Sequence, residues 1–329
     1  MNRILFIDIA KAIAIVLVVI GHYIPDNYPH WYGEMREIIY GFHMPLFMFA
    51  SGFIYIATVK EQSYHSFIWR KVKRLLVPYL VVSVLVISIK LLTQGFLYVE
   101  NPVTVMSYAK ILYLPEAGYF TWFIWALWWM FVIIPFWRTK YQRLFLLLMA
   151  VLLYFIPFQL PEMFCLKEFK GMLIYFCLGC VVWDYKSLFR RLTLIPTYVY
   201  AVFFISVNCA KTMGFLANWG GQYLLISIVG ISFVISFSRW IETNFRGMFG
   251  LLLLTLASSS YIIYLFHTTF EGFAKAAIFK VPLLSDAQND VMFSLGAIIV
   301  VSCGVMMPVI LDRYILRKYK FTKLLFGYK

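Results

Sequence analysis

The chain has 329 residues, of which 63% are apolar and only 13% are charged. A soluble domain is closer to half apolar and a quarter charged, so this balance excludes an ordinary soluble protein. It predicts an all-α protein that crosses a membrane many times. The net charge of +14 does not indicate a nucleic-acid partner, because the basic residues are distributed as membrane topology requires.

We predict about ten transmembrane helices, each roughly as long as a bilayer is thick. They lie near residues 4–24, 35–58, 75–92, 119–137, 143–157, 169–184, 194–211, 222–241, 250–272 and 291–312. The connections between them are short, so residues 1–329 are expected to form a single membrane domain without a separate soluble domain. The first span is not expected to be a cleaved signal peptide, because charged residues interrupt its apolar region.

The basic residues set the expected orientation of these spans. If the N-terminus is cytoplasmic, most of the 29 Lys and Arg residues fall in segments on the cytoplasmic side. Loops rich in Lys and Arg favour that side of a membrane. We therefore expect both termini to lie in the cytoplasm.

The first span carries three ionisable residues, Asp8, Lys11 and His22. Such groups are costly inside a membrane helix unless they face a partner or a wet cavity, so they indicate function. At about 100° per residue, all three share one face of the helix. Lys11 and His22 are separated by roughly 16 Å along the axis, which leaves room for an elongated ligand between them.

The second span contains His43, followed two residues later by Pro45. Proline has no backbone N–H and therefore frees the carbonyl one turn earlier, near Gly41. Broken membrane helices are tolerated where they line a cavity or meet a neighbouring helix. Ser51 and Gly52 are small enough to let another helix approach closely. Packing alone would explain this segment, and only the histidine favours a functional role.

The cytoplasmic end of the third span is crowded with cations. They are Arg70, Lys71, Lys73 and Arg74. Arg70 and Arg74 are one helical turn apart and could together hold phosphate groups. The preference of cations for the cytoplasmic side also explains the cluster, and both explanations stay open.

Two patterns in the middle spans have a structural explanation that we prefer. Trp122, Trp125 and Trp129 share a face that begins near the outer surface, where tryptophans commonly anchor a helix, although sugars also stack on such rings. Cys177 and Cys180 form a C-x-x-C motif, which in a soluble protein would indicate redox chemistry. Because they lie in mid-helix with no second pair, they favour packing.

The ninth span has a polar stripe on one helical face. It consists of Ser260, Tyr264, His267 and Glu271. Hydrogen bonding between helices is the alternative explanation of such a stripe. In the expected orientation, His22, His43 and His267 lie in the outer half of the membrane on three different spans. Three of the five histidines at one depth indicate a shared site rather than three separate structural roles.

The order and spacing of these residues resemble the acyltransferase-3 family of integral membrane acyltransferases along nearly the whole chain. The matching segments are Asp8-x-x-Lys11-x10-His22, Phe42-His43-Met44-Pro45-Leu46-Phe47 with Ser51-Gly52, Arg74-Leu75-x-x-Pro78-Tyr79, Trp122-Phe123 and Ser260-x-x-x-Tyr264-x-x-His267. Members of that family move an acyl group from cytoplasmic acyl-CoA to an acceptor, usually a sugar hydroxyl of a surface or exported glycan. The resemblance implies a multi-pass enzyme of the bacterial inner membrane. Its expected partners are membrane lipid, acyl-CoA, a glycan acceptor and other proteins of polysaccharide synthesis.

The resemblance also implies that His22 is the catalytic histidine. Lys11 stands where most of the family has arginine, a change seen in the branch that resembles sugar O-acetylases and biofilm-polysaccharide modifying proteins. Lysine keeps the positive charge but loses the planar, two-pronged donor geometry of arginine.

Acyl transfer to a hydroxyl needs a base, a place for the thioester and donors for the oxyanion. His22 suits the base because histidine titrates near neutrality, and His43 or His267 would orient it or stabilise the oxyanion. The acetyl- or succinyl-CoA donor is expected to bind residues of the first, third and ninth spans, namely Asp8, Lys11, Arg70, Lys71, Arg74, Ser260 and Tyr264. The glycan acceptor is expected near Trp122 and Glu271. No metal or bound prosthetic group is expected.

Two other classes of protein fit some of these features. A transporter or flippase of a glycan or small metabolite would also use buried charges and a broken helix. Many transporters show paired broken helices in two related halves, and no such repeat is found in the sequence. A membrane scaffold has little use for aligned ionisable residues. The sequence therefore favours an acyl-CoA-dependent O-acyltransferase over both alternatives.

Overall fold

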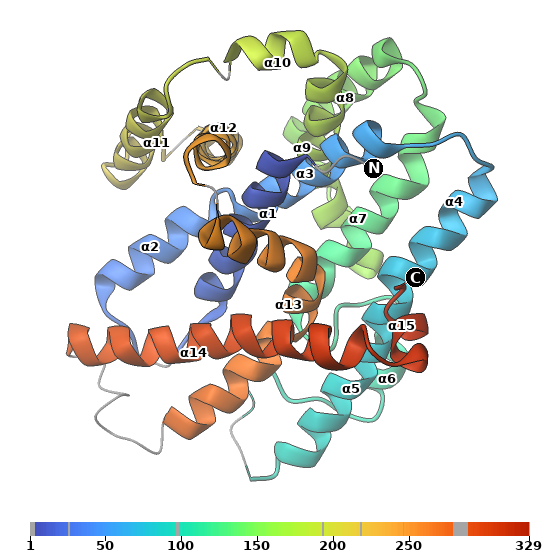
Figure 1. Cartoon of the computed structure of the whole chain (residues 1–329), viewed down its shortest axis with the longest axis vertical. Helices are drawn as coiled ribbons and strands as arrows, with labels where there is room; N and C mark the ends of the chain where they lie inside the picture. The colour runs from blue at the N-terminus through green and yellow to red at the C-terminus, as the bar shows by residue number, and fades with distance from the viewer. Residues whose placement is uncertain are drawn as a thin grey trace. The chain divides into compact units, whose positions relative to one another are not determined.

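The computed structural model describes residues 4–25, 27–96, 99, 101–192, 194–217, 219–245, 247–278 and 289–328. Over these residues the chain is helical and contains no β-strand, which confirms the predicted all-α class (Figure 1). Four of the cations behind the expected orientation lie outside the described residues. They are Arg3, Arg246, Lys280 and Lys329.

Seven segments of the described chain are long and apolar enough to cross a bilayer, or eight if α10 (Lys186–Leu192) and α11 (Thr197–Thr212) form one bent span. The seven are Leu5–His22, His30–Thr58, Tyr64–Thr93, Tyr119–Phe136, Gln222–Asn244, Met248–Ile278 and Asp290–Leu316. Multi-pass character is thus supported, whereas the count of ten and the cytoplasmic termini stay predictions. α8 (Lys140–Phe155) and α11 have 16 residues each. A helix of that length is about 24 Å long, which falls short of a hydrocarbon core of about 30 Å.

The chain folds into two compact units, which we describe separately. Unit 1 comprises Met1–Ala57 and Leu178–Val309, and unit 2 comprises Thr58–Cys177 and Ile310–Lys329. That the whole chain forms one membrane domain stays a prediction.

Unit 1 is built around its first helix (Figure 1). Its helices are α1 (Leu5–His22), α2 (His30–Tyr40), α3 (His43–Thr58), α10, α11, α12 (Gln222–Asn244), α13 (Met248–Ile278) and most of α14 (Asp290–Leu311). α1 packs against α2, α12 and α13, and α11 packs against α12. Ile7, Ala10, Ala14 and Ile15 of α1 are completely buried. The small alanine side chains let the neighbouring helices come close to the α1 backbone.

The break between α2 and α3 lies where Pro45 leaves a carbonyl without its helical donor. That carbonyl belongs to Gly41, and it accepts a hydrogen bond of 2.7 Å from Ser227 Oγ of α12. The predicted free carbonyl near Gly41 is therefore confirmed, and α12 supplies the missing donor. A Cβ atom at Gly41 would lie 2.8 Å from Ile226 Cγ2, so the glycine lets α12 approach this closely.

The end of α9 (Leu166–Asp184) that belongs to unit 1 packs tightly against α3. A Cβ atom at Gly179 would lie only 2.0 Å from the carbonyl oxygen of Phe49. The next residue, Cys180, donates its thiol to the Gly52 carbonyl at 3.4 Å. Cys177 and Cys180 are both buried and neither forms a disulfide, so the C-x-x-C motif has a packing role here.

Unit 2 contains the cationic segment of the chain. Its helices are α4 (Tyr64–Lys71), α5 (Val77–Thr93), α6 (Ser107–Lys110), α7 (Trp122–Ile133), α8, α9 as far as Cys177, and α15 (Lys320–Leu325). A π-helical turn, Val72–Leu76, joins α4 to α5. Such turns widen a helix by one residue and occur frequently at functional sites.

The C-terminal segment closes onto this turn. Buried Asp312 binds Arg317 through two hydrogen bonds, of 3.0 Å and 2.6 Å, and also accepts a hydrogen bond from the Tyr328 hydroxyl. Hydrogen bonding to Asp312 raises the pKa of Arg317 above its usual value, so the Arg317 guanidinium stays charged. Gly327, with φ of 66°, lies so close to Lys73 that a Cβ atom would be 2.8 Å from its carbonyl oxygen. This contact holds the end of the chain against the cationic turn.

Candidate active site

The structure brings the three predicted histidines together in unit 1. His22 is the last residue of α1, His43 is the first of α3, and His267 lies in α13. The ring centroids of His22 and His267 are 5.0 Å apart. The Tyr40 ring joins His43 to this pair, with its centroid 6.1 Å from that of His22 and 5.0 Å from that of His43.

The three histidines differ in accessibility. His43 and His267 are 1% and 0% exposed, whereas His22 is only partly buried. His43 Nδ1 lies 2.7 Å from the Ile39 carbonyl, and His267 Nδ1 lies 2.8 Å from the Tyr264 carbonyl. Because a carbonyl can only accept, Nδ1 carries the proton in both rings, and Nε2 of each neutral ring is an acceptor. His22 is therefore the most exposed of the three histidines.

The position of His22 is held by a row of donors that sequence reasoning did not identify. Helix α1 ends here, and its last carbonyls have no partner within the helix. Tyr32 donates to the Ile20 carbonyl at 2.8 Å, while Arg36 and Tyr40 donate to the Gly21 carbonyl at 2.9 Å and 3.1 Å. These three residues are spaced four apart on α2, so the pattern Tyr-x3-Arg-x3-Tyr in the sequence could have indicated them. The Arg36 guanidinium also complements the negative end of the α1 dipole.

The polar stripe of α13 runs through the buried core of unit 1. Ser260 donates its hydroxyl to the Ala257 carbonyl of its own helix at 2.9 Å, and the buried Tyr264 ring lies 6.2 Å from that of His267. Glu271 is also buried, and a Cβ atom at Gly304 of α14 would lie 2.8 Å from its Cγ. Among the described residues, Glu271 Oε1 has no hydrogen-bond partner. It is therefore a buried polar atom with unused bonding capacity, one turn beyond His267.

Asp8 and Lys11 form an ion pair on α1. Lys11 Nζ lies 3.7 Å from Asp8 Oδ1, and both side chains are partly exposed. α1 is continuous from Leu5 to His22, so the predicted arrangement of three ionisable groups on one helix is present. The pair reduces the cost of keeping either charge in an apolar helix.

The predicted donor cations lie in unit 2 and fall into two groups. Arg70, Lys73 and Arg74 are exposed. Lys71 instead points its ammonium at the Phe131 ring, with Nζ 3.3 Å from the ring centroid. A cation held over an aromatic face is well placed for packing and poorly placed for a phosphate. This geometry singles out Arg70 and Arg74 as the exposed arginine pair.

The three tryptophans on one face of α7 in unit 2 also differ in burial and in contacts. Trp122 is half-buried and lies edge-on to Phe123. Trp125 is buried, and Trp129 donates its indole N–H to the Phe164 carbonyl at 3.1 Å. Trp125 and Trp129 are thus engaged in packing within unit 2, and of the three only Trp122 keeps the freedom that a sugar contact needs.

A family model described as an acyltransferase domain matches residues 4–311. The chain belongs to the acyltransferase-3 family. The match includes His22, His43 and His267 and both units up to the end of α14. In the described part of this acyltransferase-3 protein, no three His, Cys, Asp or Glu side chains gather as a metal site would require.

Two curated relatives of this acyltransferase-3 protein are both called nodulation protein NolL. The one from Mesorhizobium japonicum is 27% identical over 222 residues, which is 60% of this chain and 56% of the relative. The one from Sinorhizobium fredii is 35% identical over 97 residues, which is 27% of this chain and 26% of the relative. The chain thus covers less than two thirds of either relative. No solved structure matches the chain.

Proposed function

We propose that the protein transfers an acyl group, acetyl or succinyl, from cytoplasmic acyl-CoA to a sugar hydroxyl of a surface or exported polysaccharide. The observation that carries this proposal is the partly exposed His22 beside two buried histidines. His22 ends helix α1, where side chains of α2 donate hydrogen bonds to the last carbonyls. We also propose that the protein lies in a bacterial inner membrane with both termini in the cytoplasm, as the distribution of its cations favours.

In the proposed reaction, His22 takes the proton from the acceptor hydroxyl as its oxygen attacks the thioester carbonyl. A carbon–oxygen bond forms, and the carbonyl oxygen becomes an oxyanion. When this intermediate collapses, the carbon–sulfur bond breaks, and the departing thiolate takes the proton from the His22 imidazolium. The proton and the acyl group are thereby both accounted for, and the chain needs no further reactant.

The hydrogen bonds of the buried histidines favour one role for these histidines and another for Tyr264. When the rings of His43 and His267 are neutral and Nδ1 donates to the carbonyl beside it, Nε2 can only accept, which suits orienting the His22 ring. An oxyanion instead needs a donor. The hydroxyl of Tyr264 can donate, so we assign the oxyanion to Tyr264 and a positioning role to His267.

The transfer reaction is tested with the purified full-length protein in lipid vesicles. Acetyl-CoA and succinyl-CoA serve as donors, and neutral tetrasaccharides of glucose, galactose and N-acetylglucosamine serve as acceptors. We expect release of free thiol from one donor, matched by acylated sugar in mass spectrometry. Movement of a tetrasaccharide across the membrane with no thiol release from either donor would favour a transporter and overturn the proposal.

Replacing Arg70 and Arg74 together with glutamine is expected to raise the KM for the acyl-CoA donor by about tenfold, because two charge-assisted contacts to its phosphates are lost. The KM for the acceptor should not change. The matched control replaces Arg190 and Arg191 of α10, two exposed arginines predicted on the same side of the membrane. If both double variants have the wild-type donor KM, the Arg70 cluster serves topology alone.

A further inference from the structure

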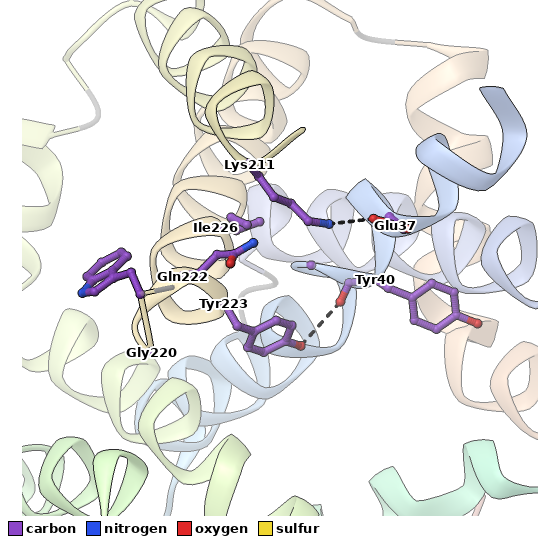
Figure 2. A pocket seen from close by; sticks show the side chains of 9 residues that line it. Glu37, Tyr40, Lys211, Gly220, Gln222, Tyr223 and Ile226 are labelled. Atoms are coloured by element: carbon purple, nitrogen blue, oxygen red, sulfur yellow. Dashed lines mark hydrogen bonds and ion pairs between the residues drawn. The ribbon is translucent and has the colours of Figure 1, made fainter. Parts of the chain in front are cut away.

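A pocket in unit 1 lies beside the histidine cluster, and no step of the proposed acyl transfer uses it. Its volume is ≈ 460 Å³, within the range of small-molecule sites. It is formed where the end of α2 meets the end of α11 and the start of α12 (Figure 2). The side chains that carry the argument are Glu37, Tyr40, Lys211, Trp219, Gln222 and Tyr223.

Tyr40 connects this pocket to the histidines. Its backbone carbonyl accepts a hydrogen bond of 3.4 Å from the Tyr223 hydroxyl on the pocket side. Its ring points away from Tyr223, as Figure 2 shows, and lies against His22 and His43. The pocket and the reactive histidine are therefore on two sides of one residue.

The lining of the pocket suits a neutral sugar. Trp219 is 51% exposed, and the face of an indole ring attracts the C–H groups of a sugar ring. Lys211 Nζ and Glu37 Oε2 are 3.0 Å apart, so the two charges cancel and the pocket has no net preference for a charged ligand. Figure 2 shows the Lys211 side chain extending across to Glu37. Such exposed ion pairs are worth little, so both groups remain able to hydrogen-bond hydroxyls.

The location of the pocket also fits an acceptor. In the predicted orientation, Lys211 and the start of α12 are on the outer side of the membrane. We propose that this pocket is a subsite for a neutral sugar unit that neighbours the acylated unit in an oligosaccharide or polysaccharide acceptor. This inference rests on the proposed function and adds where the glycan is held and which charge it carries there.

Equilibrium binding of tetrasaccharides to the full-length protein tests the subsite without requiring catalysis. The probes are neutral tetrasaccharides of glucose, galactose and N-acetylglucosamine, with tetragalacturonic acid as the charged counterpart. Trp219→Ala should weaken binding of the neutral probe that binds wild type by about tenfold, as loss of one stacking contact implies. Glu37→Gln combined with Lys211→Met should weaken it by a similar factor without removing an aromatic ring.

Trp240→Ala is the matched control. Trp240 lies on the same helix α12, is 44% exposed and is separated from Gln222 by 18 residues, or about 27 Å of helix. The affinity of the Trp240→Ala protein for the neutral probe should equal that of wild type.

The outcomes separate this inference from the proposed function. If wild type transfers acyl groups but Trp219→Ala and Trp240→Ala bind tetrasaccharides equally, the subsite is refuted and the function stands. If neutral probes bind in a Trp219-dependent way and no acyl transfer occurs, the function is refuted and the sugar site stands. Absence of binding by every neutral probe, or tighter binding of tetragalacturonic acid, overturns the subsite.

Discussion

Replacing His22 with alanine is expected to lower kcat for acyl transfer by about 10²–10⁴-fold, the contribution typical of a positioned general base. The donor KM should change little, because in the proposed reaction the imidazole acts on the acceptor proton and not on the donor phosphates. His22 is the last residue of helix α1, and its partly exposed ring lies against the rings of Tyr40 and His267. The measurement is thiol release at saturating donor and acceptor.

His65→Ala is the control for this experiment, since His65 is an exposed histidine of α4 in unit 2. It should retain wild-type kcat. His267→Gln should lower kcat less than His22→Ala and shift the pH dependence of kcat, because its proposed role is to orient the His22 ring. A His22→Ala protein that keeps more than about a tenth of wild-type kcat would exclude His22 as the base.

Replacing Gly179 with alanine is expected to destabilise the protein severely. The new Cβ atom would lie 2.0 Å from Phe49 O and 2.8 Å from Phe53 N, and both are backbone atoms that a rotamer change cannot move. Overpacking of this kind typically costs about 1–3 kcal/mol, and a clash with two backbone atoms should reach or exceed the upper end. The midpoint of thermal unfolding in detergent and the yield of folded protein measure the effect.

The control is Gly171→Ala on the same helix α9, where a Cβ atom would meet no atom within 4 Å. Alanine favours a helix over glycine by about 1 kcal/mol, so this variant should be as stable as wild type or slightly more stable. Equal unfolding midpoints for the two variants would show that α9 and α3 do not approach as closely as described.

The local features of the site could be predicted from the sequence because they depend on helical periodicity alone. Asp8, Lys11 and His22 share a face of α1 since their spacing places them there at about 100° per residue. The free carbonyl at Gly41 follows equally directly from the missing N–H of Pro45. The nearness of His22, His43 and His267 was also predictable, because three polar groups on apolar spans gain most by sharing one place.

The donors that hold these groups could not be predicted in the same way. Ser227 supplies the bond to Gly41 from a helix more than 180 positions further along the chain, and nothing near Pro45 indicates it. Lys71 looks like its neighbours Arg70 and Arg74 in the sequence, yet the packing of α7 places Phe131 against it. The number of spans was equally uncertain, since segments such as α8 are apolar but short.

The sequence by itself thus determined the all-helical membrane class and the faces on which ionisable groups lie, because composition and periodicity act within single helices. The family followed from the resemblance of its motifs, in their order and spacing, to those of known members. Only the tertiary structure decided that His22 is the accessible histidine, that Tyr32, Arg36 and Tyr40 cap α1, and that a neutral pocket lies behind Tyr40. Each of these depends on contacts between helices that are far apart in the chain. Such contacts follow from how side chains fill the space between helices, which no local pattern specifies.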